Sequence, residues 1–382
     1  MNDINPPRTV NKKKSPLMRT TAELGRWKHK VYAELGRWSR RYRIRFSDKR
    51  KHETKLNIAR AQFLSSPKSI AFVHGEDTFA LYRILGNDLP PRHVRGQTLL
   101  NLEFCLLNEP ALDNCQKWWV VNRITDPDMQ ASIIALLRQY EQNFFVIDFN
   151  VQDYRSIGLD FSRFDEGFYN DQTLQTLEAD QKQRVRLASL RLKNLYAMNN
   201  NGARNAAINH GHERAKWILP WDGNCILTKS GWHKVTGSIK QARRFPYHIV
   251  PMCRTTSNQR FLEKGFVPTS NEEPQIIFHR HASERFNDDI PYGRRPKVEL
   301  LMRLGVWGAW YGWRSDPWDF PLGERGPDWG KFALSDGWVG RLTSGNTHHE
   351  TGRSARIERM ISRDQAIIRA LERLDTENND AC

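Results

Sequence analysis

The chain has 382 residues, of which 39% are hydrophobic and 27% are charged, and this composition is typical of a globular protein rather than a disordered one. No stretch approaches the ~18 apolar residues of a membrane span, and the polar N-terminus lacks the apolar segment of a secretory signal, so export is not expected. The net charge is +16, but residues 1–60 hold 18 basic and 5 acidic residues, which places the basic character in an N-terminal arm.

This arm, residues 1–65, contains the repeated sequence AELGRW, starting at Ala22 and again at Ala33. Eleven residues make almost three helical turns, so the repeat predicts a basic amphipathic helix. One interpretation is adsorption to an anionic membrane surface. A second, of equal standing, is docking of the helix on its own domain with a solvated basic face. Nucleic-acid binding is the weakest of the three, because basic charge alone is unspecific.

Strand and helix patterns alternate from residue 66 onward. The expected strands cover 79–88, 117–124, 143–149 and 217–228, and the expected helices cover 97–110, 129–142, 182–200 and 200–215. Strands separated by helices of this length predict right-handed crossovers and a mostly parallel sheet covered on both faces. We therefore expect an α/β, Rossmann-like domain over residues 66–305, with an insertion at 150–180.

Two segments follow this domain. Residues 306–350 are rich in Trp and Gly, and most of these tryptophans are expected in the core, with one or two lining an acceptor cleft. Residues 351–382 include an amphipathic helix at 354–374. The five cysteines are widely spaced and form no Cys-x-x-Cys pair, which indicates neither a zinc site nor a disulfide framework and favours the cytoplasm.

The strand expected at 217–228 breaks off abruptly at Asp222. Ligands of open α/β sheets bind at the carboxyl ends of the strands, so Asp222 is the best candidate for a functional side chain. The Asp-Gly-Asn sequence at 222–224 is also consistent with a plain turn, since all three residue types favour turns.

A resemblance supports the functional interpretation. Gly202, Arg204 and Asn205 lie in a helix, and Asp222 and Asn224 close the following strand. This arrangement resembles GT-A glycosyltransferases, particularly the inverting family 2, in which a helix containing Gly and Arg-Asn precedes a strand ending in an Asp-x-Asp-type metal motif. Three further segments agree with it in order, YRILGND at 82–88, VVNRITDPD at 120–128 and YGRRPKVELLMRLG at 292–305. The resemblance covers residues 79–305.

What the resemblance implies first is a divalent metal, Mn or Mg, that neutralises the leaving nucleoside diphosphate. Asp222 would be a ligand, and Asn224 stands where the second carboxylate usually is. Many GT-A enzymes also take a late histidine as ligand, and His279 follows the apolar strand expected at 274–278.

The resemblance also implies where the donor nucleotide binds. The expected contacts are Arg83, Asn87, Asp88, Asn122, Arg123, Arg204 and Asn205. The second-strand loop departs from the family, because Asn122 and Arg123 stand where acidic residues usually hold the base and ribose.

An inverting transfer needs a carboxylate that takes a proton from the acceptor hydroxyl. The family's Glu-Asp pair is replaced here by Arg294, Arg295 and Pro296. We favour Asp289 over Asp288 as the base. Glu299, within the helix expected to close the domain, is a further candidate. Solvated loop acids are the competing interpretation, and a retaining mechanism or an unusual base is the alternative if none of these residues acts.

The sequence thus predicts a cytoplasmic glycosyltransferase, of the kind used in polysaccharide biosynthesis, that transfers a sugar from a nucleotide-sugar donor to a glycan or lipid-linked acceptor. Its arm would bring it to the inner face of the membrane as a peripheral protein. The alternative is a non-catalytic Rossmann-like binding protein whose basic arm holds nucleic acid or an anionic membrane surface.

Overall fold

A computed structural model describes residues 48–164, 176–293, 295–313, 318–320, 325–345 and 353–377. The AELGRW repeat lies outside the described residues, and residues 48–65 form a helix. The chain divides into two compact units, Met1–Ile58 and Ala59–Cys382. The fold presented here is that of the second unit. None of the helices in the described ranges combines the length and apolar character needed to cross a bilayer.

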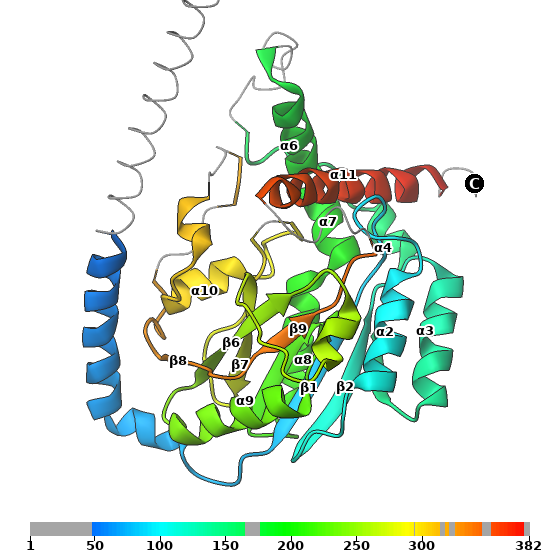
Figure 1. The fold of residues 1–382 in the computed structure, drawn as a ribbon. Helices are drawn as coiled ribbons and strands as arrows, with labels where there is room; N and C mark the ends of the chain where they lie inside the picture. The colour runs from blue at the N-terminus through cyan, green and yellow to red at the C-terminus, as the bar shows by residue number, and fades with distance from the viewer. Residues whose placement is uncertain are drawn as a thin grey trace, which may run out of the picture. The chain divides into compact units, whose positions relative to one another are not determined.

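The described residues of this unit form one mixed sheet of nine strands, in the order β3-β2-β1-β4-β7-β6-β9-β5 with β8 beside β6 (Figure 1). The strands are β1 (Phe79–Leu85), β2 (Cys115–Asn122), β3 (Asn143–Ile147), β4 (Trp217–Asp222), β5 (Cys225–Ile226), β6 (Tyr247–Arg254), β7 (Glu272–His279), β8 (Phe332–Leu334) and β9 (Val339–Arg341). Strands β1 to β4 run parallel to one another. Strand β7 is antiparallel to both of its neighbours, β4 and β6. The predicted α/β class is confirmed, but the predicted mostly parallel, Rossmann-like arrangement is not, because the reversal of β7 and the antiparallel pair β5–β9 make the sheet mixed.

Helices alternate with the strands in the first half of the unit. The helices are α2 (Gln97–Asn108), α3 (Pro127–Gln139), α4 (Val151–Arg155), α6 (Ala179–Ser189), α7 (Arg191–Met198), α8 (Asn200–Gly211), α9 (Lys229–Gln241), α10 (Val298–Leu304) and α11 (Arg353–Glu377). Short 3₁₀ turns lie at Pro67–Phe72, Asn258–Leu262 and Ala309–Gly312. Asp126 is the N-cap of helix α3. Its side chain accepts hydrogen bonds from the Asp128 and Met129 amides, so the sequence fixes where this helix begins.

The core lies on both faces of the sheet. All seven residues of β1 are buried, as expected of a central strand covered on each side. One face of the sheet packs against α2, α3 and α9. On the other face, the Tyr82 hydroxyl contacts His210 of α8 at 2.7 Å. A Cβ at Gly211 would lie 2.9 Å from the Ile218 side chain, so α8 approaches the sheet closely because this position is glycine.

The C-terminal helix α11 packs against α7 and the end of α6 (Figure 1). Its Ala366, Ile367 and Leu371 are fully buried in a cluster with Leu190 and Ala197. The helix expected at 354–374 is therefore present, and it belongs to the same unit as the sheet. The helix expected at 182–200 is instead divided at Leu190 into α6 and α7.

Three described tryptophans of the 306–350 segment, Trp310, Trp318 and Trp338, are buried. Trp307, Trp313 and Trp329 are half-buried, and Trp307 stacks on Tyr311 with ring centroids 4.4 Å apart. Half of these six tryptophans are thus in the core, where most were expected, and the expected acceptor cleft stays a prediction.

A buried histidine makes the core acid-sensitive. His248 of β6 is fully buried, its ring meets Trp217 edge-on at 5.0 Å, and neither ring nitrogen has a hydrogen-bond partner in the described structure. Burial lowers the pKa of His248 to about 3, from 6.5. As the pH falls, the His248 imidazole is therefore protonated in the unfolded chain before it is protonated in the folded protein. The contribution of the neutral imidazole to stability, present above pH 6.5, is lost as the pH falls toward 3.

We expect His248→Phe to flatten the acid limb of the stability curve by up to about 1.4 kcal/mol per pH unit, because the variant has no imidazole to protonate. Urea unfolding between pH 7 and pH 4 measures this slope. His233→Gln, at an exposed position on α9, is the matched control. Identical slopes for His248→Phe and the unmodified protein would contradict the prediction.

Candidate functional site

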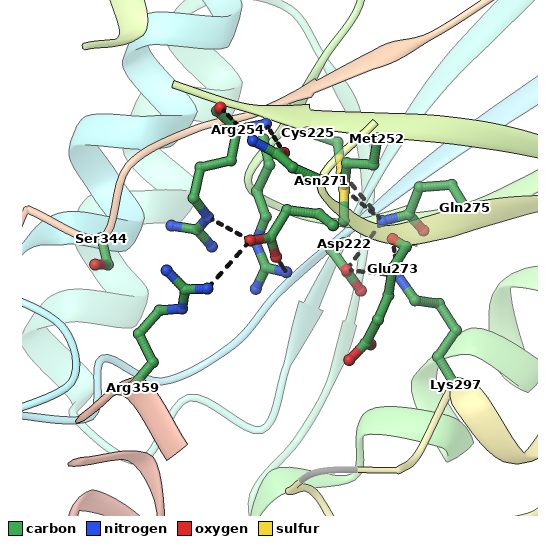
Figure 2. Close-up of polar contacts among 12 residues, drawn as sticks. Asp222, Cys225, Met252, Arg254, Asn271, Glu273, Gln275, Lys297, Ser344 and Arg359 are labelled. Carbon is green, nitrogen blue, oxygen red and sulfur yellow. Dashed lines mark hydrogen bonds and ion pairs between the residues drawn. The ribbon is translucent and has the colours of Figure 1, made fainter. Parts of the chain in front are cut away.

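Asp222 ends β4 and is held by side chains from three other elements. Its Oδ1 accepts a hydrogen bond from Nη2 of Arg204 at 2.6 Å. Its Oδ2 accepts from Nε2 of Gln275 at 2.9 Å and from Nζ of Lys297 at 3.4 Å (Figure 2). The side chain is 21% exposed. Burial acts to raise its pKa, but the charges of Lys297, Arg204 and Arg341 hold the pKa well below its usual range.

The local sequence places these groups. Arg204, on α8, is oriented by the side-chain oxygens of Asn200 and Asn201 one turn earlier. Lys297 immediately precedes α10. A Cβ at Gly223 would lie 2.4 Å from the Ile84 carbonyl oxygen, so only glycine lets the chain pass β1 directly after Asp222. Arg204, which the resemblance assigns to the donor nucleotide, is thus paired with Asp222 in the structure.

Asn224 lies in the turn between β4 and β5, where its backbone carbonyl accepts a hydrogen bond from the Leu342 amide at 2.8 Å. Its side chain is half-buried.

His279 lies at the other end of the sheet from Asp222, and this corrects the predicted ligand set. Because β7 is antiparallel to β4, His279 pairs with Trp217 at the start of β4. Five residue steps separate Trp217 from Asp222, which is about 17 Å along a strand. His279 is buried against Phe72 and Trp217, each 5.0 Å away between ring centroids.

The contacts of Asp222 also decide how well this site suits a divalent metal. Both carboxylate oxygens already accept hydrogen bonds from nitrogen donors, of which Arg204 and Lys297 are cations. In the part of the chain that the structure describes, no three His, Cys, Asp or Glu side chains are grouped as a metal site requires. A divalent ion at Asp222 would meet like charges at hydrogen-bond distance, so the residues in this arrangement do not fit the predicted metal.

Arg83 lies in the core rather than at the nucleotide edge. Its side chain is 0% exposed and forms an ion pair with Glu109, whose side chain is 2% exposed. Its Nε donates to the Cys225 carbonyl oxygen at 2.8 Å. Arg83 therefore ties β1 to β5 and to the end of α2, and we reassign it from nucleotide binding to structure.

Asn87 and Asp88 follow β1 and do lie at the carboxyl edge of the sheet. Asn87 donates to the Arg123 carbonyl oxygen at 2.7 Å and accepts from the Thr125 amide at 2.8 Å. Oδ1 of Asp88 accepts from the amide and hydroxyl of Thr98 at 2.9 and 2.7 Å. Its Oδ2 is buried without a hydrogen-bond partner in the described structure, which leaves one acceptor available at this edge.

Asn122 and Arg123 end β2 and bind the segment before α8. The Asn122 amide donates to the Met198 carbonyl oxygen at 2.9 Å and accepts from Asn199 at 2.8 Å. Arg123 bonds to the Tyr196 carbonyl oxygen, and its guanidinium lies 4.0 Å from the centroid of the Tyr196 ring. Both side chains thus hold α7 against the sheet.

Asp288 and Asp289 are both exposed, and the side chain of Asp288 is tied to α8. Asn205 donates to Oδ1 of Asp288 at 2.8 Å, and Asn205 directly follows the Arg204 that binds Asp222. Burial and the charge of Asp289 raise the pKa of Asp288, against the effect of the Asn205 hydrogen bond. Of the two predicted bases, the structure therefore connects Asp288 with the Asp222 site.

Sequence reasoning missed the start of β7. Its antiparallel direction brings Glu272 to the edge where β4 ends. Glu273 and Gln275 lie at the same edge, beside Asp222 (Figure 2). Nζ of Lys297 lies 3.3 Å from the Glu273 carbonyl oxygen and 3.4 Å from Asp222. In the described structure the Glu273 carboxylate accepts no hydrogen bond, and burial raises its pKa against the opposing charges of Lys297, Arg341 and Arg363.

Glu272 lies among arginines. Its Oε1 accepts from Nε of Arg254 at 3.0 Å and lies 3.6 Å from Arg359, and its Oε2 pairs with Arg341 at 3.0 Å (Figure 2). Arg254 and Arg341 are neighbours on the paired strands β6 and β9. Burial acts to raise the pKa of Glu272, but these arginines lower it to about 2.

The site therefore contains acids whose pKa values are shifted in opposite directions, lowered for Asp222 and Glu272 and raised for Glu273. They lie among Lys and Arg side chains at the carboxyl edge of the sheet. Comparisons of the chain with protein-family models, with curated proteins and with solved structures give no match.

Proposed function

We propose that this protein is a glycosyltransferase that moves a sugar from a nucleotide-sugar donor to a glycan or lipid-linked acceptor. The observation that carries the proposal is the position of Asp222, paired with Arg204 and Lys297 at the carboxyl end of β4. The parallel order β3-β2-β1-β4 is that of one half of a doubly wound sheet. Asp222 pairs in register with Ile84 of β1, beside the point where the strand order reverses, and such switch points bind nucleotides.

The charges around Asp222 suit the departure of a diphosphate. As the bond from sugar to phosphate breaks, negative charge grows on the leaving oxygen, and prearranged cations stabilise that charge. The charges of Lys297, Arg204 and Arg341 all lower the pKa of Asp222. These three cations would stabilise the negative charge on the leaving oxygen. No proton transfer to the leaving group is then required. Asp222 holds two of these cations in place, and its carboxylate can also accept a hydrogen bond from a hydroxyl group of the nucleotide sugar.

For the base we favour Glu273 over Asp288 and Asp289. A general base works best when its pKa lies near the working pH, and burial raises the pKa of Glu273 in that direction. Lys297 contacts both Asp222 and the Glu273 backbone, so the two acids belong to one site. The carboxylate would accept the proton of the acceptor hydroxyl while that oxygen attacks the anomeric carbon.

The test is a screen of nucleotide sugars for transfer or hydrolysis, run with magnesium, with manganese and with EDTA. We expect turnover that persists in EDTA, because protein cations neutralise the leaving group. Asp222→Ala should reduce it at least ~100-fold, since a preorganised electrostatic group is worth that much in catalysis. If EDTA abolished turnover, the result would instead support the predicted metal ion at Asp222.

The alternative, a non-catalytic binding protein, predicts a different result in the same screen. No nucleotide sugar would be turned over, and the full chain would bind generic RNA or DNA with strong dependence on salt. That outcome would contradict the transferase proposal.

A further inference from the structure

Arg92 lies in the connection between β1 and α2 and is only 6% exposed. Its Nη1 donates to the Ser344 hydroxyl at 3.1 Å. In the described structure it has no other hydrogen bond, no ion pair and no aromatic ring in contact with it. A guanidinium carries a full positive charge and five N–H donors, so one neutral partner leaves most of its hydrogen-bonding capacity unused.

Arg92 is the exception among the seven lysines and arginines that are buried in the described ranges. Each of the other six lies 3.7 Å or less from a carboxylate; they are Arg83, Arg204, Arg254, Arg295, Lys216 and Lys297. Burying a charge is costly, and buried charges are ordinarily paired for that reason. A cation kept in such a place without a carboxylate points to an anion that comes from outside the chain.

Hydrogen bonds place Arg92 at the carboxyl edge of the sheet. Its partner Ser344 lies in the segment after β9, and the Leu342 amide of this segment donates to the Asn224 carbonyl oxygen at 2.8 Å, two residues after Asp222. Leu342 and Ser344 are two residues apart, which spans at most about 7 Å. The Val94 amide donates to the Ser344 carbonyl oxygen at 3.2 Å, so the connection that carries Arg92 is fixed on the same segment. Arg92 and Asp222 therefore belong to one edge.

The unused donors of Arg92 can reach a ligand. Its Nε and Nη2 have no acceptor in the described structure, and neither atom is sealed from solvent. Two N–H groups on one side of a planar guanidinium match a pair of oxygens on a carboxylate or phosphate, which accept them in two parallel hydrogen bonds. Such a group also compensates the positive charge, which a neutral ligand would leave in place.

We propose that Arg92 binds one oxyanion, a carboxylate or phosphate group of a ligand at the carboxyl edge of the sheet, through Nε and Nη2. That this group belongs to the sugar donor or to the acceptor rests on the proposed function. Binding of a free anion at Arg92 does not.

Thermal unfolding of the full chain in sodium phosphate and, separately, in sodium acetate tests the proposal, each measured against sodium chloride at equal ionic strength. An anion that binds the folded state raises Tm in a saturable manner, and the concentration dependence gives Kd. We expect this rise with at least one of the two anions. Arg92→Met should weaken the binding by at least about tenfold, because it removes a charge-assisted pair of donors. Arg138→Gln, which removes an exposed arginine of α3, is the charge-matched control and should bind as the unmodified protein does.

The Tm in chloride alone gives a second readout. Arg92→Met should raise it, because an apolar side chain of similar length replaces a buried cation that has no carboxylate partner. A variant that melts lower in chloride and keeps its response to both anions would give Arg92 a purely structural role and overturn the proposal.

Arg92→Lys provides a second variant if Arg92→Met does not fold. Lysine keeps the charge but lacks the planar pair of donors, so its affinity for the anion should also fall. Equal affinity in Arg92→Lys and Arg138→Gln would overturn the proposal, as would the absence of any rise in Tm for the unmodified protein in phosphate and in acetate. Anion binding that depends on Arg92, without turnover of any nucleotide sugar, would uphold this site and reject the transferase. Turnover of a nucleotide sugar without any response to the free anions would do the reverse.

Discussion

Glu273→Gln should lower the rate of sugar transfer by about 10²–10⁴-fold, the usual contribution of a positioned general base. Glutamine keeps the size of the side chain and loses only its ability to take up a proton. Initial rates with a saturating donor, measured across pH, give the comparison, and the rising limb of the rate profile should disappear in the variant.

Asp289→Asn is the matched control for this prediction. Asp289 is exposed, and Arg191 approaches its backbone carbonyl oxygen at 3.4 Å. We expect its loss to change the rate less than tenfold. A large loss in Asp289→Asn together with a normal rate in Glu273→Gln would return the role of base to the residue that the sequence favours.

Glu109→Gln should destabilise the fold by about 3–5 kcal/mol, the cost of leaving one charge of a buried ion pair without its partner. Glu109 faces Arg83 and also lies 3.0 Å from Lys117, and it accepts a hydrogen bond from the Leu227 amide at 2.8 Å. Glutamine retains an acceptor for the Leu227 amide. The loss of stability would therefore come from removing the negative charge that faces Arg83. Urea unfolding at neutral pH gives the change in the free energy of unfolding.

An exposed ion pair supplies the control for Glu109. Arg260 and Glu263 lie 3.9 Å apart with both side chains more than half exposed, and Glu263→Gln should change stability by less than about 1 kcal/mol. If both substitutions had equally small effects, Arg83 would not depend on this pair, and its reassignment to the core would fail.

Local sequence patterns were sufficient for much of the fold. The alternation of apolar strands and amphipathic helices predicts the α/β class, and the abrupt end of β4 at Asp222 marks the edge where the site lies. Such features depend on neighbours in the chain, which a single sequence records. The resemblance also marks Arg204 and Asp222 as site residues, but their pairing with each other is seen only in the structure.

Contacts between distant segments could not be predicted in this way. Arg83 has the spacing of an edge residue, but its partner Glu109 lies at the end of α2, and nothing near Arg83 identifies it. Glu272 likewise pairs with Arg254, Arg341 and Arg359, which come from three separate segments. These pairs become visible only when the segments are together in space.

The reversed direction of β7 has a consequence for how this site can vary. The connection from β6 to β7, residues 255–271, leads directly into Glu272 and Glu273, so a change in its length would shift two acids against fixed cations on α8 and α10. Changes around His279, at the far end of the same strand, leave that alignment untouched. Among related chains, the length of the connection at 255–271 should therefore be tightly restricted. The sequence after His279 should vary more freely.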